Sequence, residues 1–120
     1  MSEVQIQIRR IYDDPAPTDG ARILVDRLWP RGVSKDRADL DEWCKTVAPS
    51  TDLRKWYGHD PAKFDEFAER YRRELETDDE QSAAFADLKS RAAQGPLTLL
   101  TATKEPQISE AQVLLSLLTE

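Results

Sequence analysis

Cysteine is scarce in this chain of 120 residues, because Cys44 is the only one. A single cysteine cannot form a disulfide within the chain, which argues against a small secreted domain held together by disulfides. No stretch reaches the roughly 20 consecutive apolar residues that cross a bilayer. The N-terminal segment MSEVQIQIRR alternates polar and apolar side chains and lacks the continuous apolar run of a signal peptide. We therefore expect a cytoplasmic protein with no membrane partner.

Residues that bind metals or cofactors are equally scarce. The chain has one histidine, His59, and one cysteine, so a zinc site would need two carboxylates, and no ligand spacing is visible. The four glycines do not form a glycine-rich phosphate-binding loop. No recognisable motif flanks Cys44 or His59, so we expect a buried structural thiol rather than a nucleophile–base pair. The sequence predicts no metal and no cofactor.

The charge balance limits the class of ligand. The net charge of -6 makes extended binding along a nucleic acid unlikely. Between Arg22 and Arg37, however, basic residues outnumber acidic ones. A local basic segment on an acidic protein suits a small anion better than a long polyanion.

The hydrophobic pattern predicts one α/β domain over residues 1–120, with a small parallel or mixed sheet and flanking helices. Alternation predicts a strand over residues 4–8, and apolar runs predict strands over 22–29 and 97–102. Residues 39–47 are compatible with a short helix or a strand. Capping residues and helical spacing predict helices that begin near Ser50, near Asp60, over 79–94 and after Ser109.

Charged and aromatic side chains follow the predicted strands at their carboxyl ends, where ligands collect in open parallel sheets. A cluster of arginines and a lysine can bind phosphate or carboxylate, a tryptophan offers a stacking face, and an aspartate can act as a base or orienting group. The candidate catalytic residue is Asp26, and the candidate ligand-binding residues are Arg9, Arg27, Trp29, Arg31 and Lys104. The alternative is that Asp26 and Arg27 pair with neighbouring groups and lock the edge of the sheet.

Several motifs support a family resemblance. They lie at residues 10–13 (RIYD), 19–32 (DGARILVDRLWPRG), 48–50 (APS), 53–59 (LRKWYGH) and 71–75 (YRREL). Together they resemble the YeaO-like family of uncharacterised bacterial proteins, and DRLWPRG is the most specific of them. The resemblance covers nearly the whole chain and implies a compact cytoplasmic α/β domain, but it supplies no reaction and no substrate.

The last segment departs from the family pattern. Members usually continue the final strand as Leu-Leu-Tyr-Ala-Ala-Lys-Asp and open the last helix with a His-Asn pair. In this chain Thr101 replaces the tyrosine, and Ile108 and Ser109 occupy the place of the pair, while Lys104 is kept. If the family's activity needs that histidine, this chain is an altered or inactive branch. If the arginines alone bind the ligand, binding is retained.

Three functions are compatible with these residues. The first is an enzyme acting on a small phosphate- or carboxylate-bearing metabolite. The second is a non-catalytic module that binds such an anion or contacts nucleic acid locally. The third is a protein-interaction domain whose tryptophans Trp29 and Trp56 form a partner surface. The residues do not fix turnover or oligomeric state, and anion binding is common to the first two functions.

Overall fold

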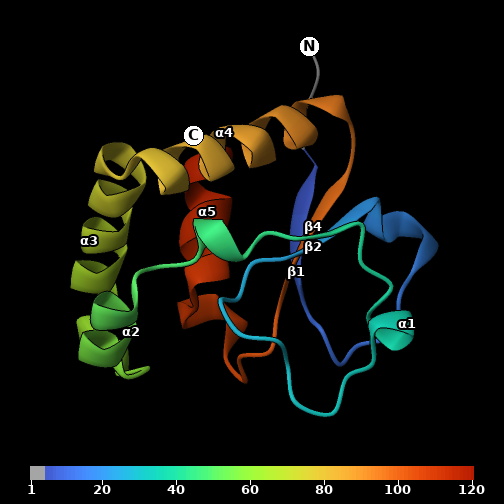
Figure 1. The fold of residues 1–120 in the computed structure, drawn as a ribbon, viewed down its shortest axis with the longest axis horizontal. Coiled ribbons are helices and arrows are strands. Elements are labelled where there is room, and N and C mark those ends of the chain that lie inside the picture. The colour runs from blue at the N-terminus through green and yellow to red at the C-terminus, as the bar shows by residue number, and fades with distance from the viewer. Residues whose placement is uncertain (1–4) are drawn as a thin grey trace.

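Four strands and five α-helices make up the computed structural model, which describes residues 5–120 (Figure 1). The strands are β1 (Ile6–Arg10), β2 (Ala21–Leu24), β3 (Glu42–Trp43) and β4 (Leu97–Thr101). The helices are α1 (Lys35–Ala38), α2 (Thr51–Tyr57), α3 (Phe64–Thr77), α4 (Asp79–Gln94) and α5 (Glu110–Leu118). No helix in this described part of the chain is both long enough and apolar enough to cross a membrane.

The four strands form a single sheet in the order β1-β4-β2-β3, and every pairing is parallel. The last strand therefore lies between the first two, with Leu99 opposite Ile8 on one side and Ile23 on the other. This arrangement confirms the predicted α/β class and, within residues 5–120, gives a parallel rather than a mixed sheet. It also brings the carboxyl ends of β2 and β4 together.

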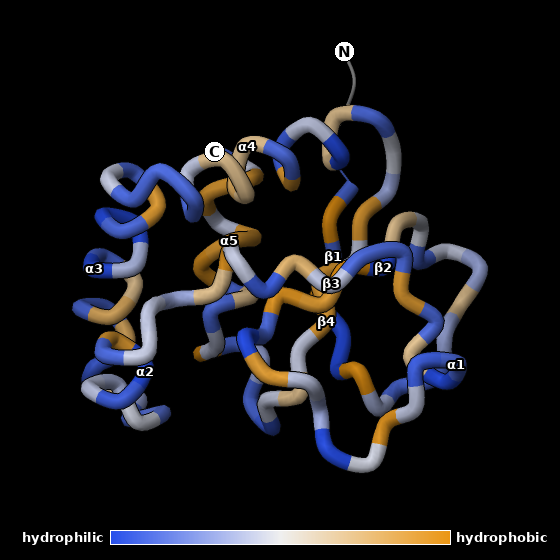
Figure 2. Tube along the Cα trace, in the orientation of Figure 1, coloured by the Kyte–Doolittle hydropathy of each residue, from blue (hydrophilic) through white to orange (hydrophobic). Residues whose placement is uncertain are grey.

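Each face of the sheet has its own hydrophobic core. Alternation along β2 and β4 directs Ile23 and Leu99 toward α3, α4 and α5, and directs Leu24 and Leu100 toward α1 and the loops on the other face. Figure 1 shows the long helices gathered on one side of the strands and α1 on the opposite side. Figure 2 shows the hydrophobic stretches concentrated along the strands and α5, while α3 alternates between hydrophilic and hydrophobic turns.

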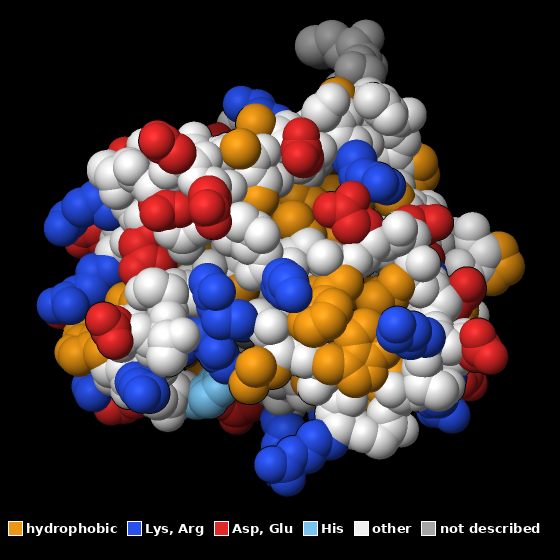
Figure 3. All heavy atoms as spheres, viewed as in Figure 1, with side chains coloured by type: hydrophobic (Ala, Val, Ile, Leu, Met, Phe, Trp, Pro, Cys, Tyr) orange, Lys and Arg blue, Asp and Glu red, His pale blue; other side chains and the backbone are white. Residues whose placement is uncertain are grey.

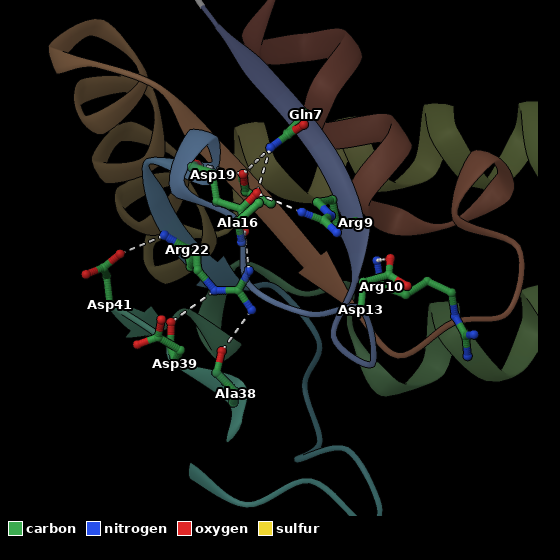
Figure 4. A network of polar contacts seen from close by, with 11 residues as sticks. Gln7, Arg9, Arg10, Asp13, Ala16, Asp19, Arg22, Ala38, Asp39 and Asp41 are labelled. Carbon is green, nitrogen blue, oxygen red and sulfur yellow. Dashed lines mark hydrogen bonds and ion pairs between the residues drawn. The ribbon is translucent and has the colours of Figure 1, made fainter. Parts of the chain in front are cut away.

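The face toward α1 also contains a buried polar network (Figure 4). Asp19, only 2% exposed, accepts hydrogen bonds from Arg22 and Arg9, and Arg22 Nη2 donates to the carbonyl of Ala38 at 2.9 Å. The N–H of Ala16 and both arginines lower the pKa of Asp19, although burial alone would raise it. The network ties β1, β2 and α1 together.

The structure changes the bounds of two predicted strands and resolves the segment that was left open. The strand predicted over 22–29 ends at Leu24. The last backbone bond to β4 is the one from Val25 N–H to the Leu100 carbonyl. The next amide of the ladder, Ala102 N–H, donates to the Asp26 carboxylate, so the pairing of the two strands stops. The first strand is shifted to Ile6–Arg10, and Val4 of its predicted range lies outside the described residues. The ambiguous segment 39–47 contains the two-residue strand β3 and a single turn of 3-10 helix.

Candidate anion-binding site

A cavity of about 380 Å³ opens at the carboxyl edge of the sheet. Its walls come from the segment after β2, the turn before α2, the carboxyl end of α2, the end of β4 and the start of α5. The polar and aromatic residues around it are Tyr12, Asp26, Arg27, Trp29, Arg31, Arg54, Tyr57, His59, Phe67, Thr103 and Glu110. This volume is within the range of roughly 300–1,000 Å³ typical of small-molecule sites.

Asp26 joins the ends of β2 and β4 at the base of the cavity. Its carboxylate accepts a hydrogen bond from Thr101 Oγ1 at 2.8 Å and another from Ala102 N–H at 2.7 Å. Its main-chain carbonyl accepts a third, from Trp43 Nε1, at 2.7 Å. The orientation of Asp26 is therefore fixed by neighbouring groups, and its side chain still borders the cavity.

Arg27 reaches from the same segment to the turn before α2. Its guanidinium donates to the carbonyls of Pro49 and Ala48 at 3.2 and 3.1 Å, which leaves part of its donor edge free. That turn is itself held from the helical layer, because Gln81 donates to the Ala48 carbonyl and Glu74 accepts from the N–H and hydroxyl of Ser50. The long helices thus position Arg27.

Two further arginines border the cavity and are more exposed. Arg54 lies on α2, and Arg31 follows the DRLWP segment. Within the described residues 5–120, neither Arg27, Arg31 nor Arg54 forms an ion pair with a carboxylate. No carboxylate of these residues therefore pairs directly with the three guanidinium groups, although Arg54 interacts with Glu110 at longer range. Trp29 completes this wall, with its Nε1 donating to the Val33 carbonyl at 2.8 Å.

Glu110, the first residue of α5, forms a carboxyl pair with Asp26. Burial raises the pKa of Glu110 well above its ordinary value, and the hydrogen bond and negative charge of Asp26 raise it further, while Arg54 opposes the shift. The protonated form of Glu110 is thereby favoured over the charged form in the folded protein. A neutral Glu110 leaves the positive charge of the three arginines in excess over the charge of Asp26 around the cavity.

The structure brings four of the six predicted site residues together: Asp26, Arg27, Trp29 and Arg31 all border this cavity. Arg9 does not, because its side chain lies on the α1 face, bonded to Asp19. The side chain of Lys104 borders an adjoining cavity instead. The basic stretch after Arg22 is also divided, since Arg22 itself is buried in the network around Asp19.

Sequence reasoning did not select Glu110, Arg54, Tyr57 or His59 as site residues. Tyr57 lies in the wall because its ring stacks on Phe67 and its hydroxyl donates to the Ile108 carbonyl at 2.6 Å. An acidic residue at a helix start, such as Glu110, is ordinarily explained by the helix dipole, so it gave no distinct signal.

The positions that depart from the family pattern have structural roles here. Thr101 binds Asp26, and the carbonyl of Ile108 accepts the bond from Tyr57. Ser109 caps α5 by accepting from Ala111 N–H at 3.2 Å. The residues in place of the His-Asn pair therefore help to hold the cavity wall, and neither of them borders the cavity.

Cys44 and the metal-binding residue types add no second candidate site among residues 5–120. Burial raises the pKa of the Cys44 thiol to about 11, so the thiol is protonated at neutral pH. Among residues 5–120, no group of three or more His, Cys, Asp or Glu side chains is placed to hold a metal ion.

A larger groove, of about 720 Å³, runs between α3 and α5. Its basic groups already face carboxylates: Arg72 pairs with Glu76 and Glu120, and Arg73 pairs with Glu69. The groove thus offers less uncompensated positive charge than the smaller cavity, although it is wider.

The fold and the cavity define a small α/β protein with an arginine-bordered pocket at the carboxyl edge of a parallel sheet. The model of the family described as "Inactive DUF488-N3 subclade" matches residues 5–120, and the chain belongs to this family. Uncharacterized protein Rv3073c of Mycobacterium tuberculosis is 47% identical over 116 residues, which cover 97% of this chain and 95% of that protein. Uncharacterized protein YeaO of Escherichia coli is 42% identical over 111 residues, covering 92% and 94%. The predicted resemblance to YeaO-like proteins is confirmed. No solved structure matches the chain.

Proposed function

We propose that this protein binds a small anionic ligand, bearing a phosphate or a carboxylate, in the cavity at the carboxyl edge of the sheet. The observation that carries the proposal is the convergence of Arg27, Arg31 and Arg54 on one cavity without an ion-pair partner among the described residues. Arginine binds phosphate and carboxylate through paired N–H donors. The aromatic ring of Trp29 supplies an apolar wall for the rest of the ligand.

Binding without turnover is the form of this function that we favour. The family to which the chain belongs is described as an inactive subclade. Asp26 as a catalytic base stays a prediction, and its carboxylate is already engaged with Thr101, Ala102 and Glu110. An orienting role, in which Asp26 fixes the cavity floor, uses the same contacts without requiring a reaction.

A thermal-shift screen tests the proposal with phosphate, nucleotides, sugar phosphates, carboxylic acids and short oligonucleotides. A ligand at about 100 times its dissociation constant adds about 2.7 kcal/mol to stability, which raises the melting temperature by several degrees. The matched variants are Arg54→Met and Lys55→Met, which remove one positive charge each from neighbouring exposed positions on α2. We expect Arg54→Met alone to lose the shift, because Lys55 does not border the cavity. A panel without any hit, or a shift equal in both variants, would contradict the proposal.

A second candidate is a protein-interaction module, and Leu28 favours it. This side chain is 67% exposed at the rim of the cavity, next to Trp29. Figure 3 shows exposed hydrophobic side chains close to Lys and Arg side chains on one face of the molecule. Trp56 lies apart from Trp29. It packs against the core on the side of α3, α4 and α5, with Arg70 over its ring at 4.4 Å, whereas Trp29 packs against the core on the α1 face. The two tryptophans therefore pack against cores on opposite faces of the sheet. Leu28→Ser in a pull-down with the intact protein as control tests this candidate.

A further inference from the structure

A second cavity, of about 400 Å³, is bordered by His59, Thr103, Lys104 and Glu105. His59 and Thr103 border both cavities, so the two spaces adjoin. We propose that the second cavity is a subsite for a second anionic group of the same ligand, with Lys104 as its cation. This inference rests on the proposed function and specifies its ligand class: a molecule with two anionic groups joined by a spacer that passes His59.

The backbone conformation at Gly58 and His59 fixes the position of His59 between the two cavities. Gly58 ends α2 in the left-handed region with φ 55°, and His59 continues in it with φ 58°. Residues other than glycine adopt this conformation rarely and at a cost in energy, and residues with such backbone strain are concentrated at functional sites. Gly58 N–H bonds to the Arg54 carbonyl, so the turn that holds His59 also fixes the helix carrying Arg54.

The opposite wall is held by the end of β4. Arg10 Nε donates to the Thr103 carbonyl at 2.9 Å, and Thr103 N–H donates to Thr101 Oγ1 at 3.2 Å. Because Thr101 also binds Asp26, this wall is continuous with the floor of the first cavity. Lys104 follows directly, and its exposed ammonium forms no ion pair with a carboxylate of residues 5–120.

The charges of the second cavity determine how it acts. Lys104 brings one positive charge and Glu105 one carboxylate, whereas the first cavity has three arginines beside the carboxyl groups of Asp26 and Glu110. The second cavity is therefore too weak to hold an anion by itself. It contributes when the ligand is already anchored at the arginines, because the second contact is then intramolecular and benefits from a high effective concentration.

Isothermal titration of the whole protein with α,ω-alkylene bisphosphonates of increasing length, each compared with the alkylphosphonate of equal length, tests this subsite. We expect one spacer length to bind at least roughly tenfold more tightly than its monophosphonate, since linked contacts raise overall affinity. Lys104→Met should remove that advantage and leave the monophosphonate dissociation constant unchanged. Lys55→Met, with the same loss of charge outside both cavities, should preserve the advantage.

The outcomes separate this inference from the proposed function. If the monophosphonate binds through Arg54 but no bisphosphonate gains affinity, the subsite is wrong and the proposed function stands. If the gain persists in Lys104→Met, or is lost equally in Lys55→Met, the second group does not use Lys104 and the inference fails. If neither class of phosphonate binds, both proposals fail.

Discussion

Replacing Glu110 by glutamine tests the carboxyl pair in the cavity through the pH dependence of stability. In the folded protein, burial and then Asp26 raise the pKa of Glu110 above the ordinary carboxyl value of 4.5. Between that value and the raised one, the unfolded chain has lost this proton and the folded chain keeps it. The stability that Glu110 contributes is therefore fully present below the pKa of the unfolded state, and it is lost as the pH rises through the higher pKa of the folded state.

The magnitude follows from a difference of one proton. In this window the free energy of unfolding of the natural protein falls, through Glu110, by about 1.4 kcal/mol per pH unit. Glu110→Gln has no proton to lose, and its amide can still donate to Asp26. The variant should therefore gain stability relative to the natural protein as the pH rises, and the gain should level off above the folded pKa.

Urea unfolding in small pH steps from about 5 to about 8 measures this gain for each protein. Asp26→Asn provides the coupling control, because without the charge of Asp26 the gain from Glu110→Gln should shrink in a double-mutant cycle. A stability difference between Glu110→Gln and the natural protein that is flat across this range would refute the carboxyl pair.

Two further changes test the framework around the site. Asp19→Asn should destabilise the fold by about 3–5 kcal/mol, because it leaves the buried Arg22 without its counter-ion. Folding lowers the pKa of Asp19 from its ordinary value of 3.8, so this stability is present above pH 3.8 and is lost as the pH falls through the pKa of the folded state. Urea unfolding curves of the variant and the natural protein should therefore converge in acid. A difference in stability that stays constant with pH would contradict the ion pair. Gly20→Ala should destabilise far more than Gly32→Ala in thermal unfolding. Both glycines have positive φ, which alanine adopts only at a cost in energy. Only at Gly20, however, would the new Cβ lie 2.2 Å from the Pro96 carbonyl oxygen. Equal losses would show that the close approach of these two segments is wrong.

Features set by local chemistry were predictable from the sequence. The helix over 79–94 has the predicted bounds, and Ser50 and Ser109 cap α2 and α5 through their side chains. Capping and apolar periodicity act within a few residues, so the sequence shows them directly. The DRLWPRG segment follows a strong apolar run, so the sequence also showed that it lies at the carboxyl end of a strand, where the structure has a cavity.

Features set by partners distant in sequence were not predictable. The apolar pattern of β2 continues past Leu24, yet the ladder stops there because the Asp26 carboxylate takes the amide of Ala102. Arg9 precedes a turn at the end of β1, yet it pairs with Asp19 on the α1 face. Glu110 joins the site only because α5 begins beside the end of β4. Each of these depends on which strands and helices are neighbours in space.

Titration of the ¹⁵N-labelled protein with inorganic phosphate, followed by two-dimensional NMR, tests the central claim most directly. The account predicts saturable shifts confined to the cavity, at the amides of Arg27, Ala48, Arg54 and Thr103 and at the Nε–H groups of the two arginines. Shifts at the α3–α5 groove, shifts scattered over the surface, or none at all would show that the arginines at the carboxyl edge of the sheet are not an anion site.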